Sequence, residues 1–315
     1  MRSWRGHGPG WMMIACGVVV AGVGPAEAIT IRHDVPDQAY VDLSLQQKYQ
    51  SVGWLRISRE RDYLCSGTLI GGKWVLTAAH CVDNARISQV TYTDSQNRPH
   101  AATQWFTHEA WQGNLRAGWD IALVELDQPL TDITPAQLYT RDDERGRVAT
   151  MVGYGKTGTG LTGSTEPPLT RRAGQNVLDV FGGDRNLQIW SSRLVFSDFD
   201  PPSDVFEVNR WGDFTPLELE ASIAPGDSGG GTFIDVDGRT FLAGVHSLLF
   251  ASDLSFNADY GDGFASTRVS AFTDWIAGHT GILAVGPVPV PEPGALGAVA
   301  ALAGVWASTR RHRGS

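Results

Sequence analysis

The sequence predicts a mostly β fold, and two observations carry that prediction. Short apolar runs of strand length recur along the chain, separated by Gly, Asp and Pro, and glycine is abundant at 37 of 315 residues. Such runs with frequent turn residues are typical of antiparallel sheets rather than of helices. The length allows one large or two small globular domains. The formal net charge of −9 argues against the basic face that nucleic-acid binding requires, so we expect no nucleic-acid partner.

The first half of the body contains a series of runs with strand character. Gly71-Gly72 provides the turn between the second predicted strand and the third. A polar, turn-rich segment at 129–146 then predicts a crossover to a second half. The predicted strands are residues 51–57, 63–70, 73–77, 90–92, 103–106 and 121–126.

The second half repeats the pattern and ends in a helix. Asp235-Val236-Asp237-Gly238 lies between two runs and predicts a hairpin turn. A calcium loop there would need further ligands and a glutamate at the right spacing, which the sequence lacks. Apolar residues at helical spacing within 269–278, ending at a glycine, predict a C-terminal helix. The predicted strands are 148–154, 175–180, 192–197, 230–236, 239–246 and 263–268.

Three separated motifs supply a hydroxyl, an imidazole and a carboxylate. His80 lies in Leu-Thr-Ala-Ala-His-Cys, Asp120 begins Asp-Ile-Ala-Leu, and Ser228 lies in Gly-Asp-Ser-Gly-Gly. A serine hydroxyl needs an adjacent base to attack a carbonyl, and imidazole suits that task near neutral pH. A buried carboxylate orients the imidazole. These residues predict a catalytic triad that needs no cofactor and no metal.

In these motifs and their order, residues 50–279 resemble the trypsin-like (chymotrypsin-fold) serine proteases. The resemblance implies an all-β fold of two six-stranded antiparallel β-barrels with a short C-terminal helix. It also implies a serine endopeptidase that acts on protein or peptide substrates through an acyl-enzyme intermediate. The N–H groups of Gly226 and Ser228 would then form the oxyanion hole. A catalytically silent binding module and an esterase with the same triad are the alternatives.

The resemblance implies two further pairings. A Cys65–Cys81 disulfide would brace the loop that carries His80, whereas two buried free thiols are the alternative. The α-amino group of Ile29 would pair with Asp227 after signal cleavage. A mature start within residues 46–51 would exclude that role for Ile29.

The resemblance also places a substrate pocket. Ser222 would form its floor, and Ser247 and Leu248 would lie on its wall. A neutral floor favours an apolar or aromatic side chain immediately before the cleaved bond (the P1 residue). A shift of one residue would instead put Asp262 on the wall and favour Lys or Arg.

Residues 1–28 are interpreted as a secretory signal peptide. Arg2 and Arg5 precede an apolar run over residues 11–23, and Ala26-Glu27-Ala28 fits a cleavage site. An uncleaved membrane anchor is the alternative. Removal of this segment would leave a protease domain over residues 29–283.

The C-terminal segment differs in composition from the rest of the chain. A Pro-rich linker over 284–293 contains Val290-Pro291-Glu292-Pro293, and 294–315 is an apolar helix with a basic tail. This arrangement resembles the PEP-CTERM sorting signal of Gram-negative bacteria. It implies recognition by sorting and processing machinery, with transient or permanent membrane contact through 294–307. A plain C-terminal anchor is the alternative. We expect an exported protein, located in the periplasm, in the cell envelope or outside the cell.

Overall fold

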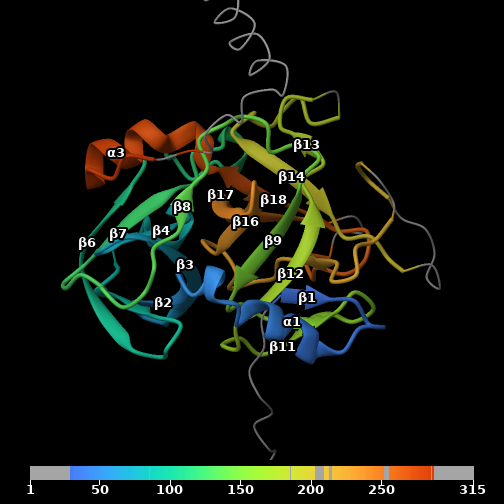
Figure 1. Ribbon diagram of the computed structural model, residues 1–315, viewed down its shortest axis with the longest axis horizontal. Coiled ribbons are helices and arrows are strands. Elements are labelled where there is room, and N and C mark those ends of the chain that lie inside the picture. Colours follow the sequence, from blue (N-terminus) through green and yellow to red (C-terminus); the bar gives the residue numbers. More distant parts are fainter. Residues whose placement is uncertain are drawn as a thin grey trace, which may run out of the picture.

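The first half of the chain forms a closed antiparallel barrel with the strand order β2-β3-β4-β7-β6-β5, on the left of Figure 1. Its strands alternate between core and solvent: in β2, Leu55 and Ile57 are fully buried whereas Arg56 is exposed. The predicted six-stranded barrel is confirmed for this half. The strands are β2 (Val52–Ser58), β3 (Tyr63–Gly71), β4 (Trp74–Thr77), β5 (Gln89–Thr93), β6 (Pro99–Thr107) and β7 (Ala122–Leu126).

The second half forms a half-barrel, and with the first barrel it confirms the predicted mostly β fold; its sheet has eight strands and is more open than the six-stranded barrel expected. Among the described residues, the path β12-β9-β16-β17-β18-β14-β13 does not return from β13 to β12, and β8 joins β17 in parallel. The strands are β8 (Gln137–Leu138), β9 (Val148–Gly153), β12 (Arg172–Val177), β13 (Val180–Phe181), β14 (Leu194–Asp198), β16 (Gly231–Val236), β17 (Arg239–Phe250) and β18 (Gly263–Arg268).

A buried side chain bridges part of the opening in this second sheet. The Asn176 amide nitrogen on β12 donates to the carbonyl oxygens of Asp198 at 2.7 Å and Ala221 at 3.0 Å. These bonds tie β12 to β14 and to the next strand along the chain. A side chain therefore satisfies backbone groups that a continuous ladder would otherwise pair.

A third sheet, which the sequence analysis did not predict, lies beside the second half at the bottom of Figure 1. Its order is β11-β10-β1-β15, and the helix α1 (Asp37–Ser44) and the 3₁₀ helix η1 (Gln47–Tyr49) follow β1. The sheet attaches the beginning of the described chain to the segment before Ser228. Its strands are β1 (Ile29–Ile31), β10 (Thr157–Thr159), β11 (Gly163–Glu166) and β15 (Ala221–Ser222).

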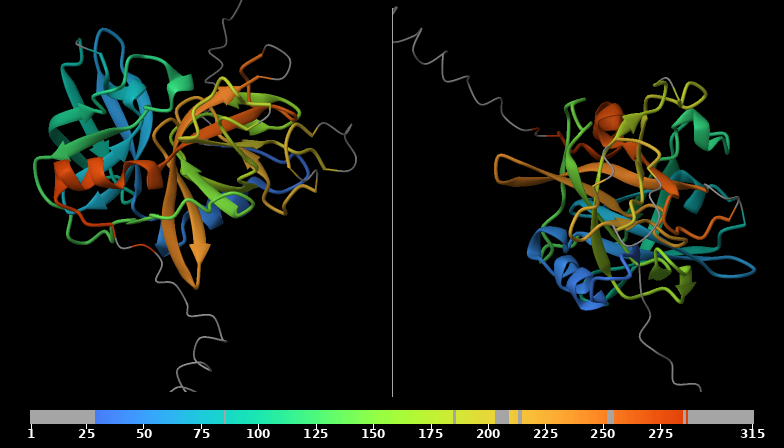
Figure 2. Two further views of the ribbon diagram at one scale, coloured as in Figure 1. Left: turned by 90° about the horizontal axis from the view of Figure 1, so that it is seen from above. Right: turned by 90° about the vertical axis from the view of Figure 1, so that its right-hand side faces the viewer.

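The predicted hairpin and the predicted C-terminal helix are both confirmed. Val236 pairs with Arg239, and Asp237 and Gly238 have positive φ angles of 50° and 73°, as a tight two-residue hairpin requires. The 3₁₀ helix η3 (Val269–Phe272) continues into α3 (Thr273–Thr280). Ile276 of α3 is buried in the core of the first barrel, so this helix crosses back over that barrel (Figure 2). This helix therefore ties the two halves together.

The structure describes residues 29–84, 86–184, 186–202, 209–212, 215–251, 255–284 and 286. The expected signal peptide at 1–28, most of the 284–293 linker and the expected sorting segment at 294–315 lie outside them. Within the described ranges no helix is long and apolar enough to cross a membrane.

Candidate active site

His80 and Asp120 form a hydrogen-bonded pair where the two halves meet. His80 lies on α2 (Ala79–Val82), directly after β4, and Asp120 lies just before β7. The His80 Nδ1 atom is 2.7 Å from Asp120 Oδ2, and the His80 backbone N–H donates to Asp120 Oδ1 at 2.8 Å. Both carboxylate oxygens are therefore used to fix the orientation of one imidazole.

The second half of the chain holds Asp120 from the other side. The Ser247 hydroxyl donates to Asp120 Oδ2 at 2.6 Å, and the Thr267 hydroxyl donates to the Asp120 carbonyl at 3.0 Å. Asp120 is fully buried, whereas the His80 side chain keeps 23% of its surface exposed. The carboxylate is shielded from water and the imidazole can reach a substrate.

The environment of His80 favours its protonated form. Burial acts to lower the pKa of His80, but the charge and the hydrogen bond of Asp120 outweigh it, so the pKa is raised above the ordinary histidine value. A base with this environment can accept a proton and hold the positive charge beside the carboxylate. Such an imidazole is suited to general-base chemistry.

Ser228 lies in a tight turn that leaves its side chain partly exposed. Gly229 has a φ angle of +83°, and a Cβ there would lie 2.0 Å from Thr77 Oγ1, so only glycine fits. The Ser66 N–H donates to the Ser228 carbonyl at 2.8 Å and fixes the turn against β3 of the first barrel. The turn from the second half is therefore docked on the half that carries His80.

His80, with its partner Asp120, and Ser228 lie on either side of the Cys81 sulfur. A ring nitrogen of His80 lies within 4.8 Å of the Cys81 sulfur, which is 3.8 Å from the Ser228 carbonyl oxygen. The hydrogen bonds among the described residues include the His80–Asp120 pair but none from the Ser228 hydroxyl to His80. Such a bond is often long in a site without substrate.

The backbone amides of Gly226 and Ser228 are available to a ligand. Neither N–H donates to an acceptor among the described residues, whereas the amides of Asp227, Gly229 and Gly230 all donate to carbonyl oxygens. Two unused donors beside a serine hydroxyl form the kind of site that stabilises a developing oxyanion.

The expected disulfide between Cys65 and Cys81 is present. It joins β3 to α2, and thereby fixes the short helix that carries His80. Cys65, His80 and Cys81 are also the one group of possible metal ligands that cluster closely within the described ranges. Because both sulfurs are in the disulfide, neither is available as a thiolate ligand.

Asp227 is fully buried beneath the nucleophile turn. Its carboxylate accepts the N–H groups of Gly155 and Ala224, each at 2.8 Å, and also a hydrogen bond from the Ile29 backbone. Burial raises the pKa of Asp227 to about 7 despite these donors. The first residue of the described chain therefore lies against the carboxylate expected to pair with it.

The residues expected to form the substrate pocket are all buried. Ser222 is fully buried, and its hydroxyl donates to the Ile223 carbonyl at 3.3 Å. Ser247 binds Asp120, whereas Leu248 is buried in an apolar cluster with Phe196 and other residues of the second sheet. Asp262, the alternative wall residue, is 1% exposed and accepts a backbone hydrogen bond from Phe199.

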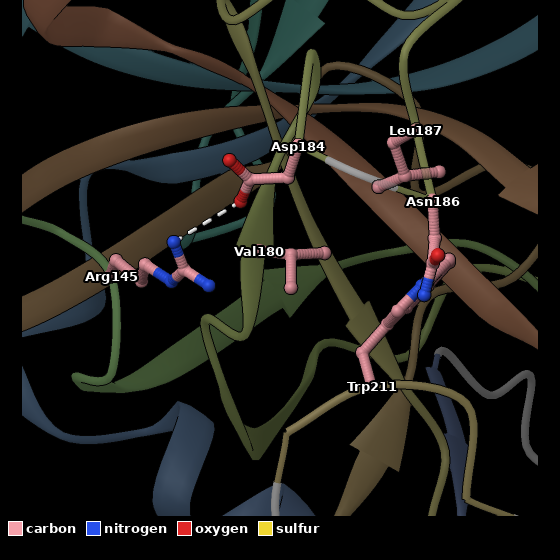
Figure 3. Close-up of a pocket in the computed structure, with 6 residues that line it drawn as sticks. All are labelled: Arg145, Val180, Asp184, Asn186, Leu187 and Trp211. Atoms are coloured by element: carbon pink, nitrogen blue, oxygen red, sulfur yellow. Dashed lines mark ion pairs between the residues drawn. The ribbon is translucent and has the colours of Figure 1, made fainter.

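A separate hollow of about 280 Å³ lies over the second sheet (Figure 3). Arg145 and Asp184 form an ion pair of 3.1 Å at one side, and Trp211 lies at the other. Its lining residues are Arg145, Val180, Asp184, Asn186, Leu187 and Trp211. It contains none of the predicted site residues.

A buried group of acids lies beneath this hollow. Asp198 accepts the backbone N–H of Trp211 at 3.2 Å, and Asp179, Asp200 and Glu220 are near enough to interact with it electrostatically. Burial, followed by the charge of Asp198, raises the pKa of Asp179 to about 9. Asp179 therefore keeps its proton in the folded state at neutral pH.

We expect the substitution Asp179→Asn to stabilise the protein above neutral pH. The folded-state pKa of Asp179 is raised above its unfolded value of 3.8, so its contribution to stability is complete below pH 4 and is lost as pH rises toward 9. Asparagine has nearly the shape of the protonated aspartate side chain and, like it, carries no charge. The melting temperature at pH 8 should rise by about 5 °C, which corresponds to a gain of roughly 2 kcal/mol in the free energy of unfolding. The melting temperature of the variant should also fall less steeply as the pH rises.

Thermal unfolding from pH 5 to pH 9 tests this expectation. Asp127→Asn, at an exposed position, is the control for loss of one negative charge. An unchanged pH dependence in the Asp179 variant would show that Asp179 is ionised in the folded protein.

Comparisons with known proteins place the chain in a family. A family model described as Trypsin matches residues 43–174. Chymotrypsin-like elastase family member 1 of Canis lupus familiaris is 32% identical over 222 residues, which span 68% of this chain and 80% of that protein. The chain belongs to the trypsin-like serine protease family. Brachyurin of Leptuca pugilator is 29% identical over 230 residues, which span 70% of this chain and 89% of that protein.

A solved structure supports the trypsin-like fold. It is titled HL collagenase at 1.7 Å resolution, and it matches with a TM-score of 0.54 and 23% identity over 74% of this chain and 94% of that chain. At this identity the likeness concerns the fold alone. The curated collagenase of Hypoderma lineatum is 29% identical over 259 residues, spanning 79% of this chain and 84% of that protein.

Sequence reasoning missed one further residue of this trypsin-like site. The Ser66 hydroxyl donates to the Gly226 carbonyl at 3.1 Å and accepts the Tyr154 N–H at 3.0 Å. Ser66 thus links the first barrel to the turn of Ser228. Its position directly after Cys65 was the one available signal, and a serine within a strand carries no chemistry by itself.

Proposed function

We propose that this protein is an exported serine endopeptidase that uses His80, Asp120 and Ser228. The observation that carries the proposal is the 2.7 Å hydrogen bond between His80 Nδ1 and the buried Asp120 carboxylate, next to Cys81, whose sulfur lies 3.8 Å from the Ser228 carbonyl oxygen. Relatives named as elastase, collagenase and chymotrypsin support peptide-bond hydrolysis. No cofactor takes part in the proposed reaction.

The reaction proceeds in two halves. The Ser228 oxygen attacks the peptide carbonyl while the Ser228 hydroxyl proton moves to His80 Nε2, and Asp120 stabilises the resulting imidazolium. The amides of Gly226 and Ser228 donate to the oxyanion. His80 then returns the proton to the leaving amine, which leaves an ester on Ser228. Water, deprotonated by His80, cleaves that ester and restores the hydroxyl.

Signal cleavage after Ala28 is proposed to complete the site. The new α-amino group of Ile29 would lie where its backbone nitrogen now contacts the buried Asp227 carboxylate. A positive charge there would hold Asp227 ionised and fix the turn that carries the oxyanion amides.

We expect a protein that starts at Ile29 to be about 100-fold more active than one with two extra residues before Ile29. Blocking the ammonium leaves a buried carboxylate without its counter-charge, at a cost of about 3 kcal/mol. Peptide turnover by both forms, normalised to folded protein, measures the effect. Equal activity, or a natural mature N-terminus within 46–51, would contradict this role for Ile29.

The ends of the chain are proposed to direct the enzyme to the cell envelope. Residues 1–28 would be removed on export, leaving a protease domain over 29–283, and the 294–315 segment after the 284–293 linker would be read by sorting machinery. The disulfide agrees with an oxidising compartment. Intact mass of the protein recovered from envelope and medium would locate both mature ends.

Labelling with a fluorophosphonate tests the proposed chemistry. The purified protein should form a covalent adduct that mass spectrometry maps to Ser228. The Ser247 hydroxyl in the same site is an internal control and should stay unlabelled. Absence of labelling would favour a catalytically silent binding module, and labelling with turnover of esters but not of peptides would favour an esterase.

A further inference from the structure

A fully buried histidine lies against the turn of Ser228. His246 on β17 has no exposed surface. Its backbone holds the residues after Ser228: the His246 carbonyl accepts the Gly229 N–H at 2.8 Å, and the His246 N–H donates to the Gly230 carbonyl at 2.9 Å. Its side chain holds the residue before Ser228, because Nδ1 lies 3.1 Å from the Asp227 carbonyl oxygen. His246 therefore contacts the turn on both sides of Ser228.

The contact with Asp227 determines which nitrogen of the His246 imidazole carries the proton. A carbonyl oxygen only accepts hydrogen bonds, so Nδ1 is the protonated nitrogen. Nε2 has no hydrogen-bond partner among the described residues. Burial lowers the pKa of His246 to about 4, although the backbones of Asp227 and Gly231 favour the charged form. The ring is therefore neutral near pH 7, and its single N–H is directed at Asp227.

The bond from the imidazole fixes the place of the turn and is not needed to satisfy the Asp227 carbonyl. That carbonyl also accepts the Gly230 N–H at 2.8 Å, a bond within the turn itself. Glycine at 230 allows the imidazole its close approach, because a Cβ there would lie 2.8 Å from His246 Nδ1. The bond from His246 therefore adds a link between the turn and β17.

The residue after His246 links the same strand to the general base. The Ser247 hydroxyl donates to Asp120 Oδ2, the oxygen that also binds His80 Nδ1. Two consecutive residues of β17 thus contact the two parts of the site that must meet, the turn of Ser228 and the Asp120–His80 pair. A shift of the turn relative to β17 would change the distance between the Ser228 hydroxyl and His80.

We propose that His246 is a positioning residue, whose Nδ1–H bond to the Asp227 carbonyl holds the turn so that the Ser228 hydroxyl faces His80. Because His246 is fully buried, it does not touch the substrate and acts only through the turn. A displacement of about 1 Å at a reacting group lowers the rate about 100-fold. Loss of this one bond should therefore slow the chemical step more than it weakens substrate binding. The inference rests on the proposed peptidase function.

Two substitutions of similar size test this role in the protein that starts at Ile29. Leucine has no donor, so folded His246→Leu should show a kcat for a peptide amide that is about 100-fold lower, with KM changed by less than about twofold. Asparagine places an amide N–H near the position of Nδ1, so His246→Asn should keep kcat within about tenfold of wild type. A kcat for His246→Asn as low as that of His246→Leu would overturn the proposal.

Tyr92→Phe is the matched control. Tyr92 is fully buried in the first barrel, and its hydroxyl donates to the Ser51 carbonyl at 2.9 Å. The substitution removes the same kind of bond, from a buried side chain to a backbone carbonyl, and should leave kcat unchanged. An equal loss of kcat in Tyr92→Phe and His246→Leu would show that His246 acts only through stability, which would overturn the proposal.

The ring nitrogens of His246 provide a measurement that does not depend on activity. In the nitrogen-15 spectrum of the isotope-labelled wild-type protein at pH 7, the assigned His246 signals should show a neutral ring with its proton on Nδ1. A proton on Nε2 instead would leave no donor for the Asp227 carbonyl. That result would overturn the proposal whether or not any variant folds.

Fluorophosphonate labelling separates the two possible failures. A wild-type protein that is not labelled would overturn the peptidase function itself. If the wild type is labelled but folded His246→Leu keeps kcat within about threefold of it, only the positioning role is overturned. Where His246→Leu does not fold, His246→Gln replaces it, because its amide lies one carbon further from the backbone than Nδ1. His246→Gln should lower kcat by about tenfold or more, and an unchanged kcat would overturn the positioning role.

Discussion

The substitution Ser228→Ala is expected to lower kcat for peptide hydrolysis by about 10⁶-fold. Without the hydroxyl no acyl-enzyme forms, and the amides of Gly226 and Ser228 can assist only direct attack by water. Substrate binding should change little, because the removed oxygen acts on the carbonyl carbon. Initial rates at saturating peptide measure the loss.

Ser88→Ala is the control for this experiment. Ser88 is exposed in the first half of the chain, where its hydroxyl donates to a backbone carbonyl, and its loss should leave kcat unchanged. A Ser228→Ala protein that keeps more than about one hundredth of wild-type kcat would exclude Ser228 as the nucleophile.

The substitution Asp120→Asn is expected to lower kcat by about 10⁴-fold with little change in the fold. Asp120 now accepts bonds from His80 and Ser247 on the same carboxylate oxygen. An amide in this position would present an N–H to one of these groups and favour the wrong tautomer of His80. The charge that raises the pKa of His80 would also be lost, so the lower pKa that governs kcat/KM should fall.

The first barrel offers a matched control in a second buried histidine–aspartate pair. Asp94 is fully buried and accepts a hydrogen bond of 2.9 Å from His100. Asp94→Asn removes the same kind of interaction away from Ser228, so folded protein should keep its activity and its pH profile. Equal losses in both variants would mean that Asp120 acts only through stability.

The sequence carries a stronger signal for the proposed catalytic residues than for a substrate pocket. His80, Asp120 and Ser228 stand out because each lies in a local motif whose residue types the proposed reaction requires. The first barrel was also predictable, since its strands alternate between buried and exposed side chains. Ile29 and Asp227, by contrast, were joined only through the resemblance.

The packing of β17 on β18 depends on a register that the sequence does not reveal. The pairing of β17 with β18 shifts between His246 and Leu248, and this irregularity brings Leu249 opposite Phe264. One extra residue in a strand moves the following side chains to the other face of the sheet. The third sheet was missed for a related reason: its strands are two to four residues long and lack a readable alternation.

Asp120 and Ser228 lie on different halves of the chain, and this has a consequence for how the protein loses activity in denaturant. Ser247 and Thr267 of the second half hold Asp120 of the first, and Ser66 of the first half holds the turn of Ser228. A small hinge-like separation of the halves would break these links while each core stayed intact. In a urea titration, enzyme activity should therefore vanish at lower denaturant than the far-ultraviolet circular dichroism signal of the sheets.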